Sequence, residues 1–393
     1  MIEMKKILAV AAVCGLMAAV QAAEIVPVGE ISLMGGSSFY EGDSSASGGN
    51  FNLAAVPAVK FSDTVSLLPG YYADYRGSKN VYELIGGGTL YQDSMSHNLT
   101  LRLINKIAPG HKFKLKAGYV WNYFRETKEE LWGEGLFDYE KFTAGVENET
   151  ADSFGFNKFI VSVDLLKVKF PQYSSLASSK YGTEVFPGGN ILDFNGANIY
   201  LRGLKKIGEK SMFDLNLNFL LKDFPDQNVI DSMGAYTLRR RADRTSSAEA
   251  VYSHLFGGFS AGISLGGEVN RSNQDHYDAE KTEFVARYYD YNSLSAGPVF
   301  SFGRVLTTSV AYRYGLKNYA GRLAQKSDAG YTSDKVSNKT QMLSLGISCK
   351  LTKNVKAKIA ANYFSQSSNQ KYEAVYQYSY DTYNAEAGVV YEF

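Results

Sequence analysis

Apolar and polar residues alternate along this chain in runs of about ten residues. Between positions 112 and 117, Phe113, Leu115 and Ala117 alternate with lysines. A β-strand sends successive side chains to opposite faces, so each run predicts a strand with one apolar and one polar face. Similar alternation occurs over residues 213–222, 259–270, 306–317, 343–351, 355–363 and 384–393.

The spacing of these runs distinguishes two all-β folds. Strands of about ten residues can cross a bilayer when tilted, with the apolar face towards lipid. A soluble sandwich has the same period with the apolar face turned inward. Short and long connections alternate here, as in membrane barrels, where short turns and long loops occupy opposite ends. The expected short connections lie at 62–63, 108–110, 206–210, 257–258, 303–304 and 353–354, and the long ones near 40–48, 77–94, 127–138, 172–190, 224–243, 274–283, 319–336 and 367–376.

We therefore predict an all-β, transmembrane, antiparallel up-and-down β-barrel of about 16 strands. Residues 139–153 alternate poorly, so a count of about 14 or 18 strands is also possible. Pro298 falls within an expected strand, where its missing N–H predicts a bulge or a strand end.

The amino terminus has the pattern of a secretory signal peptide. Lys5 and Lys6 precede an apolar run over residues 7–20, and Ala22 and Ala23 follow it. The run is short for a membrane helix, so we expect cleavage after the small residues. The expected division is residues 1–23 as signal peptide and 24–393 as barrel.

At the other end, Tyr391 and Phe393 lie on the apolar face of the last predicted strand. This ending resembles the final strand of bacterial outer-membrane β-barrels, whose terminal aromatic residue is part of the signal for the barrel assembly machinery. Phe170-Pro171 and Phe224-Pro225 follow predicted strands in the way expected of strand-exit signals. With the Tyr-rich loop edges and the closing segment at 367–369, the chain resembles β-barrel porin families of outer-membrane proteins.

The resemblance implies a bacterial outer-membrane location in contact with lipid and lipopolysaccharide. Related barrels include passive pores and barrels that export exopolysaccharide. We therefore expect a porin-like channel for small hydrophilic solutes, with polymer export and a closed structural or adhesive barrel as alternatives. The oligomeric state stays open.

Composition narrows the chemistry. The formal net charge is +1, which gives no reason to expect a nucleic-acid partner. The chain has 29 Tyr and 23 Phe but only 2 Trp and 8 Pro, which suits many strands with aromatic girdles. Cys349 is the one cysteine beyond the signal peptide, so no internal disulfide is expected. With only 4 His, we expect no metal and no cofactor.

The polar faces of the predicted strands carry more basic than acidic residues. Because a ring of basic side chains favours anions, this excess predicts a mildly anion-selective lumen. The alternative is that these residues keep the lumen wet and pair with loop carboxylates. The selectivity candidates are Lys112, Lys114, Lys116, Arg313, Lys356 and Lys358.

Two further segments suggest contacts at the long-loop end. A basic rim cluster could bind lipopolysaccharide phosphates or an anionic substrate, or could simply be a solvated loop face. Residues 185–189 are similar to the constriction-loop segment of porins and predict a fold into the lumen, with an ordinary extracellular turn as the alternative. The basic rim cluster comprises Arg239, Arg240, Arg241 and Arg244.

Catalysis has little support in the sequence. Asp275-His276 and Ser253-His254 are adjacent pairs, and adjacent side chains of a strand point apart. Neither pair has an identifiable third residue to orient the histidine. We expect the protein not to be an enzyme.

Overall fold

The computed structural model describes residues 24–40, 43–77, 93–125, 129–173, 190–278, 283–373 and 377–393. The expected signal peptide and the segment at 185–189 lie outside the described residues. None of the described residues forms a helix long and apolar enough to cross a membrane.

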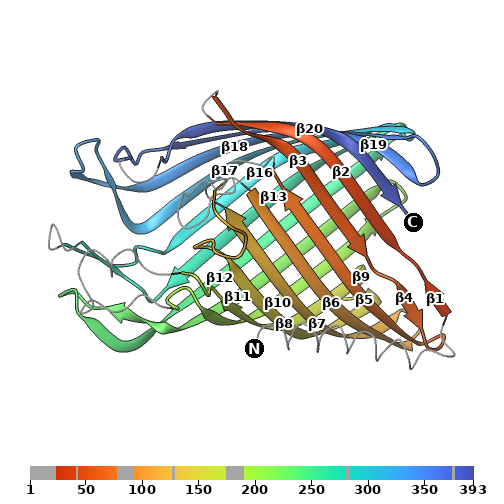
Figure 1. Ribbon diagram of the computed structural model, residues 1–393, viewed down its shortest axis with the longest axis horizontal. Coiled ribbons are helices and arrows are strands. Elements are labelled where there is room, and N and C mark those ends of the chain that lie inside the picture. Colours follow the sequence, from red (N-terminus) through yellow and green to blue (C-terminus); the bar gives the residue numbers. More distant parts are fainter. Residues whose placement is uncertain are drawn as a thin grey trace.

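Twenty strands make up the regular structure of the described residues (Figure 1). The first ten are β1 (Glu24–Val26), β2 (Gly29–Tyr40), β3 (Asp43–Ala55), β4 (Ala58–Lys60), β5 (Val65–Arg76), β6 (Asp93–Ala108), β7 (His111–Arg125), β8 (Tyr139–Ser153), β9 (Phe156–Lys169) and β10 (Phe194–Ile207). The others are β11 (Ser211–Ile230), β12 (Tyr236–Phe256), β13 (Phe259–Ser272), β14 (His276–Asp278), β15 (Glu283–Val285), β16 (Tyr291–Phe302), β17 (Leu306–Gln325), β18 (Tyr331–Lys350), β19 (Val355–Ser368) and β20 (Tyr380–Glu392).

Eighteen of these strands form one sheet, which closes on itself. Each long strand pairs antiparallel with its neighbours in sequence, and β2 pairs with β20 from Glu30↔Glu392 to Tyr40↔Thr382. The three-residue strands β1 and β4 pair with each other at the edge of this wall, so sixteen strands form the barrel. The predicted all-β, antiparallel up-and-down barrel is confirmed.

The segment at 139–153, which left the strand count open, is the regular strand β8. It pairs with β7 and β9 on its two sides. A tight turn follows, in which Asp152, Phe154 and Gly155 have positive φ angles of 47°, 55° and 79°. The count therefore settles at sixteen.

All the expected short connections are present, and they lie at the end of the barrel that also holds β1, β4 and the carboxy terminus (Figure 1). Gly110 and Gly257 turn the chain with φ angles of 73° and 59°, a region that glycine enters without a Cβ clash. This agrees with the predicted alternation of turn lengths.

Three of the expected long loops are largely strand. The barrel strands β11 and β12 extend through most of 224–243, β17 and β18 through most of 319–336, and β3 begins at Asp43. These extensions lack apolar alternation, so the sequence pattern gave no sign of them. Their backbones are nevertheless paired across the hairpins.

The expectation about the two Phe-Pro pairs is correct for one pair, and the expectation about Pro298 is wrong. Phe170-Pro171 does end β9, but Phe224-Pro225 lies inside β11, where the register with β12 shifts between Phe224 and Asn228. Pro298 makes neither a bulge nor a strand end. Its ladder with β17 lacks partners at Gly297 and Pro298 and resumes in the same register at Val299↔Ala311. The missing N–H therefore interrupts the pairing locally without displacing the strand.

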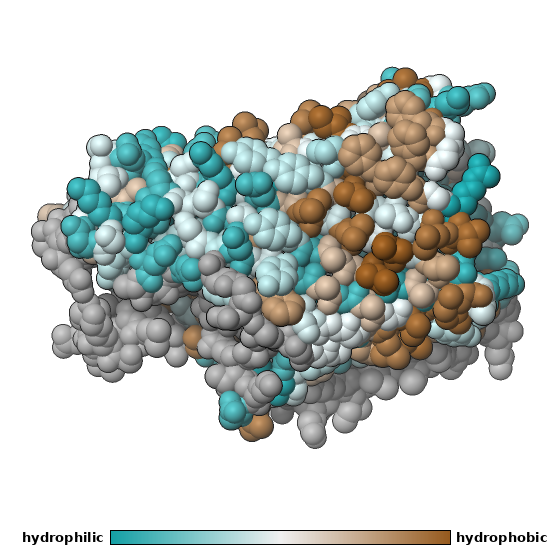
Figure 2. Space-filling model, turned by 90° about the horizontal axis from the view of Figure 1, so that it is seen from above, coloured by the Kyte–Doolittle hydropathy of each residue, from teal (hydrophilic) through white to brown (hydrophobic). Residues whose placement is uncertain are grey.

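The outer face of the barrel is apolar over part of its height. Figure 2 shows hydrophobic residues gathered over the half of the barrel nearer the short turns, and hydrophilic ones over the half with the strand extensions. Leu345 and Val389 are 36% and 46% exposed, and Leu215, Leu217 and Ile347 are partly exposed. None is buried in a core, as expected for side chains that face lipid.

Candidate functional site

The inner wall can be followed from strand to strand, because directly paired residues of neighbouring strands share a face. Lys112 of β7 pairs with Glu149 of β8, and Lys114 pairs with Glu147. Glu147 pairs in turn with Ser162 of β9. The even-numbered residues of β7 therefore point into the lumen, as the alternation predicted.

These inner-wall residues form a continuous charge ladder, defined as Lys112, Lys114, Lys116, Glu147, Glu149 and Asp164. Lys112 lies 3.1 Å from Glu149, and Lys114 lies 2.6 Å from both Glu149 and Glu147. Lys116 lies 2.8 Å from Asp164. The side chain of Lys114 is only 10% exposed, so its ammonium is held between two carboxylates at the wall.

The partners of these lysines come from strands rather than loops. Sequence reasoning missed Glu147 and Glu149 because β8 alternates poorly around them. One signal could have found them: two acids two residues apart lie opposite two lysines two residues apart, once the turn at 152–155 is placed.

A second group of lysines, the basic wall, lies near the short-turn end. It comprises Lys350 of β18 with Lys356 and Lys358 of β19, and Lys350 pairs directly with Lys356. Lys356 makes an ion pair with Glu392. Among the described residues, Lys350 and Lys358 make no ion pair. The basic wall therefore has three lysines to one close carboxylate.

Arg313 lies in a third part of the lumen, against Glu249 of β12. Its guanidinium also donates to the Ser264 hydroxyl at 3.1 Å, and that hydroxyl donates to Glu249 at 3.2 Å. This predicted selectivity residue is thus neutralised by a carboxylate from another strand.

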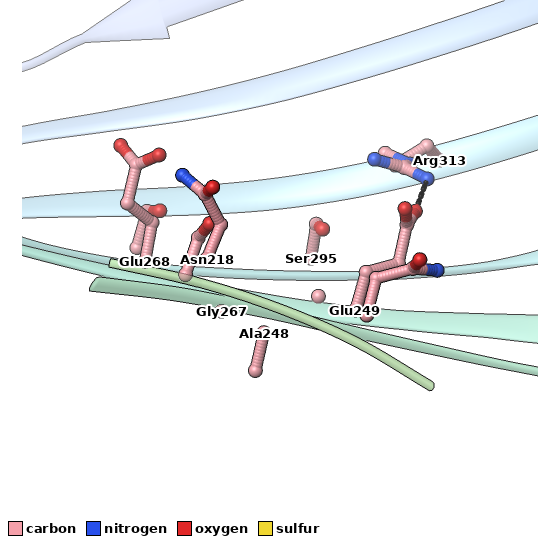
Figure 3. Close-up of a pocket in the computed structure, with 11 residues that line it drawn as sticks. Asn218, Ala248, Glu249, Gly267, Glu268, Ser295 and Arg313 are labelled. Atoms are coloured by element: carbon pink, nitrogen blue, oxygen red, sulfur yellow. Dashed lines mark hydrogen bonds and ion pairs between the residues drawn. The ribbon is translucent and has the colours of Figure 1, made fainter. Parts of the chain in front are cut away.

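Arg313 and Glu249 border a polar recess in the wall, with a volume of about 330 Å³. In Figure 3, Glu268 and Asn218 lie on one side of the recess and the Glu249–Arg313 pair lies on the other. Ser295 lies between the two sides. The recess is lined by Asn216, Asn218, Ser247, Ala248, Glu249, Gly266, Gly267, Glu268, Ser293, Ser295 and Arg313, from β11, β12, β13, β16 and β17.

The basic rim cluster divides between two environments. Arg241 points inward and holds Asp243 at 2.7 Å, with its guanidinium 4.7 Å from the ring centroids of Phe224 and Tyr289. Arg239, Arg240 and Arg244 are exposed on β12. Contact of the exposed arginines with phosphate groups stays a prediction.

An aromatic and basic cluster near the long-connection end was not anticipated from the sequence. The Lys317 ammonium lies 3.7 Å from the Tyr291 ring centroid, and the Arg322 guanidinium lies 5.0 Å from that of Tyr288. Arg322 also donates to the Tyr378 hydroxyl at 2.6 Å. Cations over aromatic faces stabilise such contacts, so this cluster ties β17 to the segments on either side of it.

The adjacent pairs Ser253-His254 and Asp275-His276 both make their contacts with residues outside the pair. His254 bonds to the Ser211 hydroxyl at 2.7 Å on the outer face, while Ser253 faces inward. The Asp275 carboxylate accepts from the Arg287 N–H at 2.7 Å, and His276 stacks on Tyr288 at 4.4 Å. No carboxylate bonded to His254 is found in the described part of the chain, and the absence of enzyme activity stays a prediction.

Within the residue ranges that the structure covers, no group of three or more His, Cys, Asp or Glu side chains could hold a metal ion. Cys349 is a free thiol. The expectation of no metal and no cofactor stays a prediction.

The carboxy-terminal aromatic residues close the barrel seam. Gly29 N–H donates to the Phe393 carbonyl at 2.9 Å, and Phe393 N–H donates to the Gly29 carbonyl at 3.0 Å. Tyr391 and Phe393 stack with ring centroids 6.0 Å apart and are 45% exposed on the outer face. They are therefore accessible to a membrane or to a partner from outside the barrel.

Comparison with known proteins finds no matching family model and no matching curated protein. Solved structures do match over most of the chain. OmpT of Vibrio cholerae in its trimer form is 11% identical, covers 95% of this chain and 100% of its own, and has a TM-score of 0.49. The outer membrane protein opdK of Pseudomonas aeruginosa is 10% identical over 94% and 99%, with a TM-score of 0.48.

A bacterial polysaccharide outer membrane secretin is 10% identical over 93% of this chain and 98% of its own, with a TM-score of 0.46. All three are described as outer-membrane proteins. Identities of 10–11% and TM-scores below 0.5 indicate no particular function for this chain. The barrel architecture therefore rests on the strand register and the faces of this chain.

Proposed function

We propose that this protein is an outer-membrane barrel that forms a passive channel for small hydrophilic solutes. The main support is that the described residues form no packed apolar interior. The largest side chains below 2% exposure are Val336, Val390, Thr382, Ser38 and Ser162.

A solid protein interior would bury Leu, Phe and Trp at close-packed density. Here the inward-facing positions carry lysines, glutamates, serines and asparagines, which need water or polar partners. Barrels of about sixteen strands are wide enough to enclose an aqueous channel. A hydrated lumen is therefore the arrangement that best satisfies these side chains.

The proposal includes a location in the bacterial outer membrane. The outward apolar band supports insertion in a bilayer, and the pattern of residues 1–23 supports export by a cleaved signal peptide. Phe393 would then serve recognition by the assembly machinery, and lipopolysaccharide would contact the outer rim.

Site-directed thiol labelling in a planar bilayer tests the proposal. Ser344 faces the lumen and its neighbour Leu345 faces outward. In a Cys349→Ser background, Ser344→Cys should lose single-channel conductance after reaction with a bulky charged thiol reagent. The matched variant Leu345→Cys should keep its conductance, because its thiol lies outside the ion path.

Three outcomes separate the candidate functions. Steady ohmic steps with the Ser344-specific block support the passive channel. Silence until an extracellular connection is deleted would instead indicate a gated polymer exporter. Silence in every variant would indicate a structural or adhesive barrel and would overturn the proposal.

A further inference from the structure

The polar recess beside Arg313 offers hydrogen-bonding groups that the protein itself does not use. Asn218, Ser247, Ser293 and Ser295 make no side-chain hydrogen bond within the described part of the chain. They come from β11, β12 and β16, with β13 between the last two in the wall, and Asn218 pairs with Ser247 in register. A carboxamide and hydroxyls can both donate and accept, so these groups are available to a polar ligand.

Small residues produce the hollow. Gly266 lies opposite Ser295, and a Cβ on Gly266 would come within 2.7 Å of the Ser295 hydroxyl. Gly315, the next residue in this row, pairs with Ser295 on its other side. Larger side chains in this row would fill the space, so the recess depends on glycine and serine in neighbouring strands.

The charges at the recess favour some ligands over others. Glu249 neutralises Arg313, whereas Glu268 makes no ion pair with another described residue and accepts the Tyr291 hydroxyl at 2.6 Å. Among the residues that line the recess, two carboxylates against one guanidinium leave a formal charge of −1. An anionic ligand is therefore disfavoured here, although other parts of the lumen are basic.

We propose that the recess is a binding station for small neutral polyhydroxylated solutes of sugar size. Such solutes present donors and acceptors all around a compact ring, which matches the mixture of amide, hydroxyl and carboxylate groups. The volume of about 330 Å³ lies at the lower end of ordinary small-molecule sites. This inference rests on the proposed channel, because the solute reaches the recess through the lumen.

The test measures ion-current block by three probes with the same pyranose ring: glucose, glucosamine and glucuronate. Glucose should block the current in a saturable way, glucosamine should block at lower concentration because of Glu268, and glucuronate should be weakest. Block by glucuronate at the lowest concentration, or no saturable block by glucose, would overturn the proposal.

Two variants link the block to the recess. Ser295→Leu should weaken glucose block about tenfold, by filling the hollow and removing a hydrogen-bonding group. The control Ser96→Leu makes the same change on an inward position of β6, on the opposite side of the barrel wall from β16, and should keep the block. Glu268→Gln should remove the advantage of glucosamine over glucose. Equal effects of Ser295→Leu and Ser96→Leu would overturn the assignment.

Equilibrium dialysis with labelled glucose separates this inference from the channel itself. Conductance without saturable block would overturn the recess and leave the channel standing. Glucose binding that Ser295→Leu abolishes, in a protein that never conducts, would support the recess and overturn the channel. Absence of both binding and conductance would overturn both.

Discussion

The charge ladder of β7 to β9 and the basic wall of β18 and β19 face the same lumen with different neighbours. In the ladder, three lysines meet three carboxylates from adjacent strands at 2.6 to 3.1 Å. In the basic wall, three lysines meet only Glu392. Three lysines thus lie among three carboxylates in one region, where Lys158 also contacts Glu149, and beside a single carboxylate in the other.

The largest expected effect concerns the seam beside the basic wall. Deletion of Phe393 removes the terminal ring and both backbone hydrogen bonds to Gly29, so the amount inserted in the outer membrane should fall several-fold. Phe393→Ala removes the ring but keeps the backbone hydrogen bonds to Gly29. Comparing it with the deletion therefore separates the effect of losing the ring from the effect of opening the seam. Immunoblots of outer-membrane fractions measure both, and normal insertion of the deletion variant would contradict the assigned role.

The next effect concerns Glu149, which holds Lys112, Lys114 and Lys158 together. Glu149→Gln should destabilise the barrel by about 2 kcal/mol, because charged hydrogen bonds are lost around the nearly buried Lys114. The matched variant Glu392→Gln releases only Lys356 and should cost less. Denaturant titration of heat-modifiable gel migration gives both values, and equal destabilisation would contradict the difference between the two regions.

Ion selectivity should respond unequally to the two regions. Replacing Lys350 and Lys358 with Gln should move the reversal potential towards cation preference. Replacing all six ladder residues by neutral Gln or Asn should change it little, because the ladder has no net charge. Both measurements belong at low ionic strength, since the Debye length falls from roughly 30 Å at 0.01 M to 3 Å at 1 M. A larger shift from the six-residue variant would show that the ladder dominates the field.

Replacing only the three ladder lysines with Gln should still move the reversal potential towards cations. In this variant the shift arises because Glu147, Glu149 and Asp164 lose their partners. Comparison with the six-residue variant shows how much of the shift in reversal potential comes from the carboxylates that lose their partners and how much from the loss of the lysines. An unchanged potential would place the ladder away from the ion path.

The smallest effect is a pH dependence at the long-connection end of the ladder strands. Asp138 lies between β7 and β8, where burial raises the pKa of its carboxyl to about 6, against the opposite effect of N–H donation from Phe124 and Gly135. A raised folded-state pKa stabilises the fold most below pH 4 and progressively less as pH rises through 6. Hydrogen exchange of the Phe124 amide should therefore quicken between pH 4 and pH 7, after correction for intrinsic exchange. Asp138→Asn should lack this step, and an identical profile in the variant would contradict it.

The period-two pattern was enough to predict which side chains of β7 and β18 face the lumen and which face lipid. It could not predict the neighbours of Lys114, because cross-strand contacts depend on register, and the register of β7 with β8 is set by turns far from the lysines. It also missed the extensions of β11 and β12, since strands beyond the apolar band need no apolar alternation. The recess depends on Gly266 and Ser295 meeting across two strands, which a single strand does not reveal.

If the lumen conducts, the basic wall should give it a preference for anions, because only Lys356 of its three lysines makes an ion pair among the described residues. The most direct measurement is the reversal potential of the purified wild-type protein in a planar bilayer, under a KCl gradient at low ionic strength. We expect an open channel with a reversal potential displaced towards that of chloride, and a displacement that shrinks as salt rises. A potential displaced towards that of potassium, or no conductance at all, would contradict it.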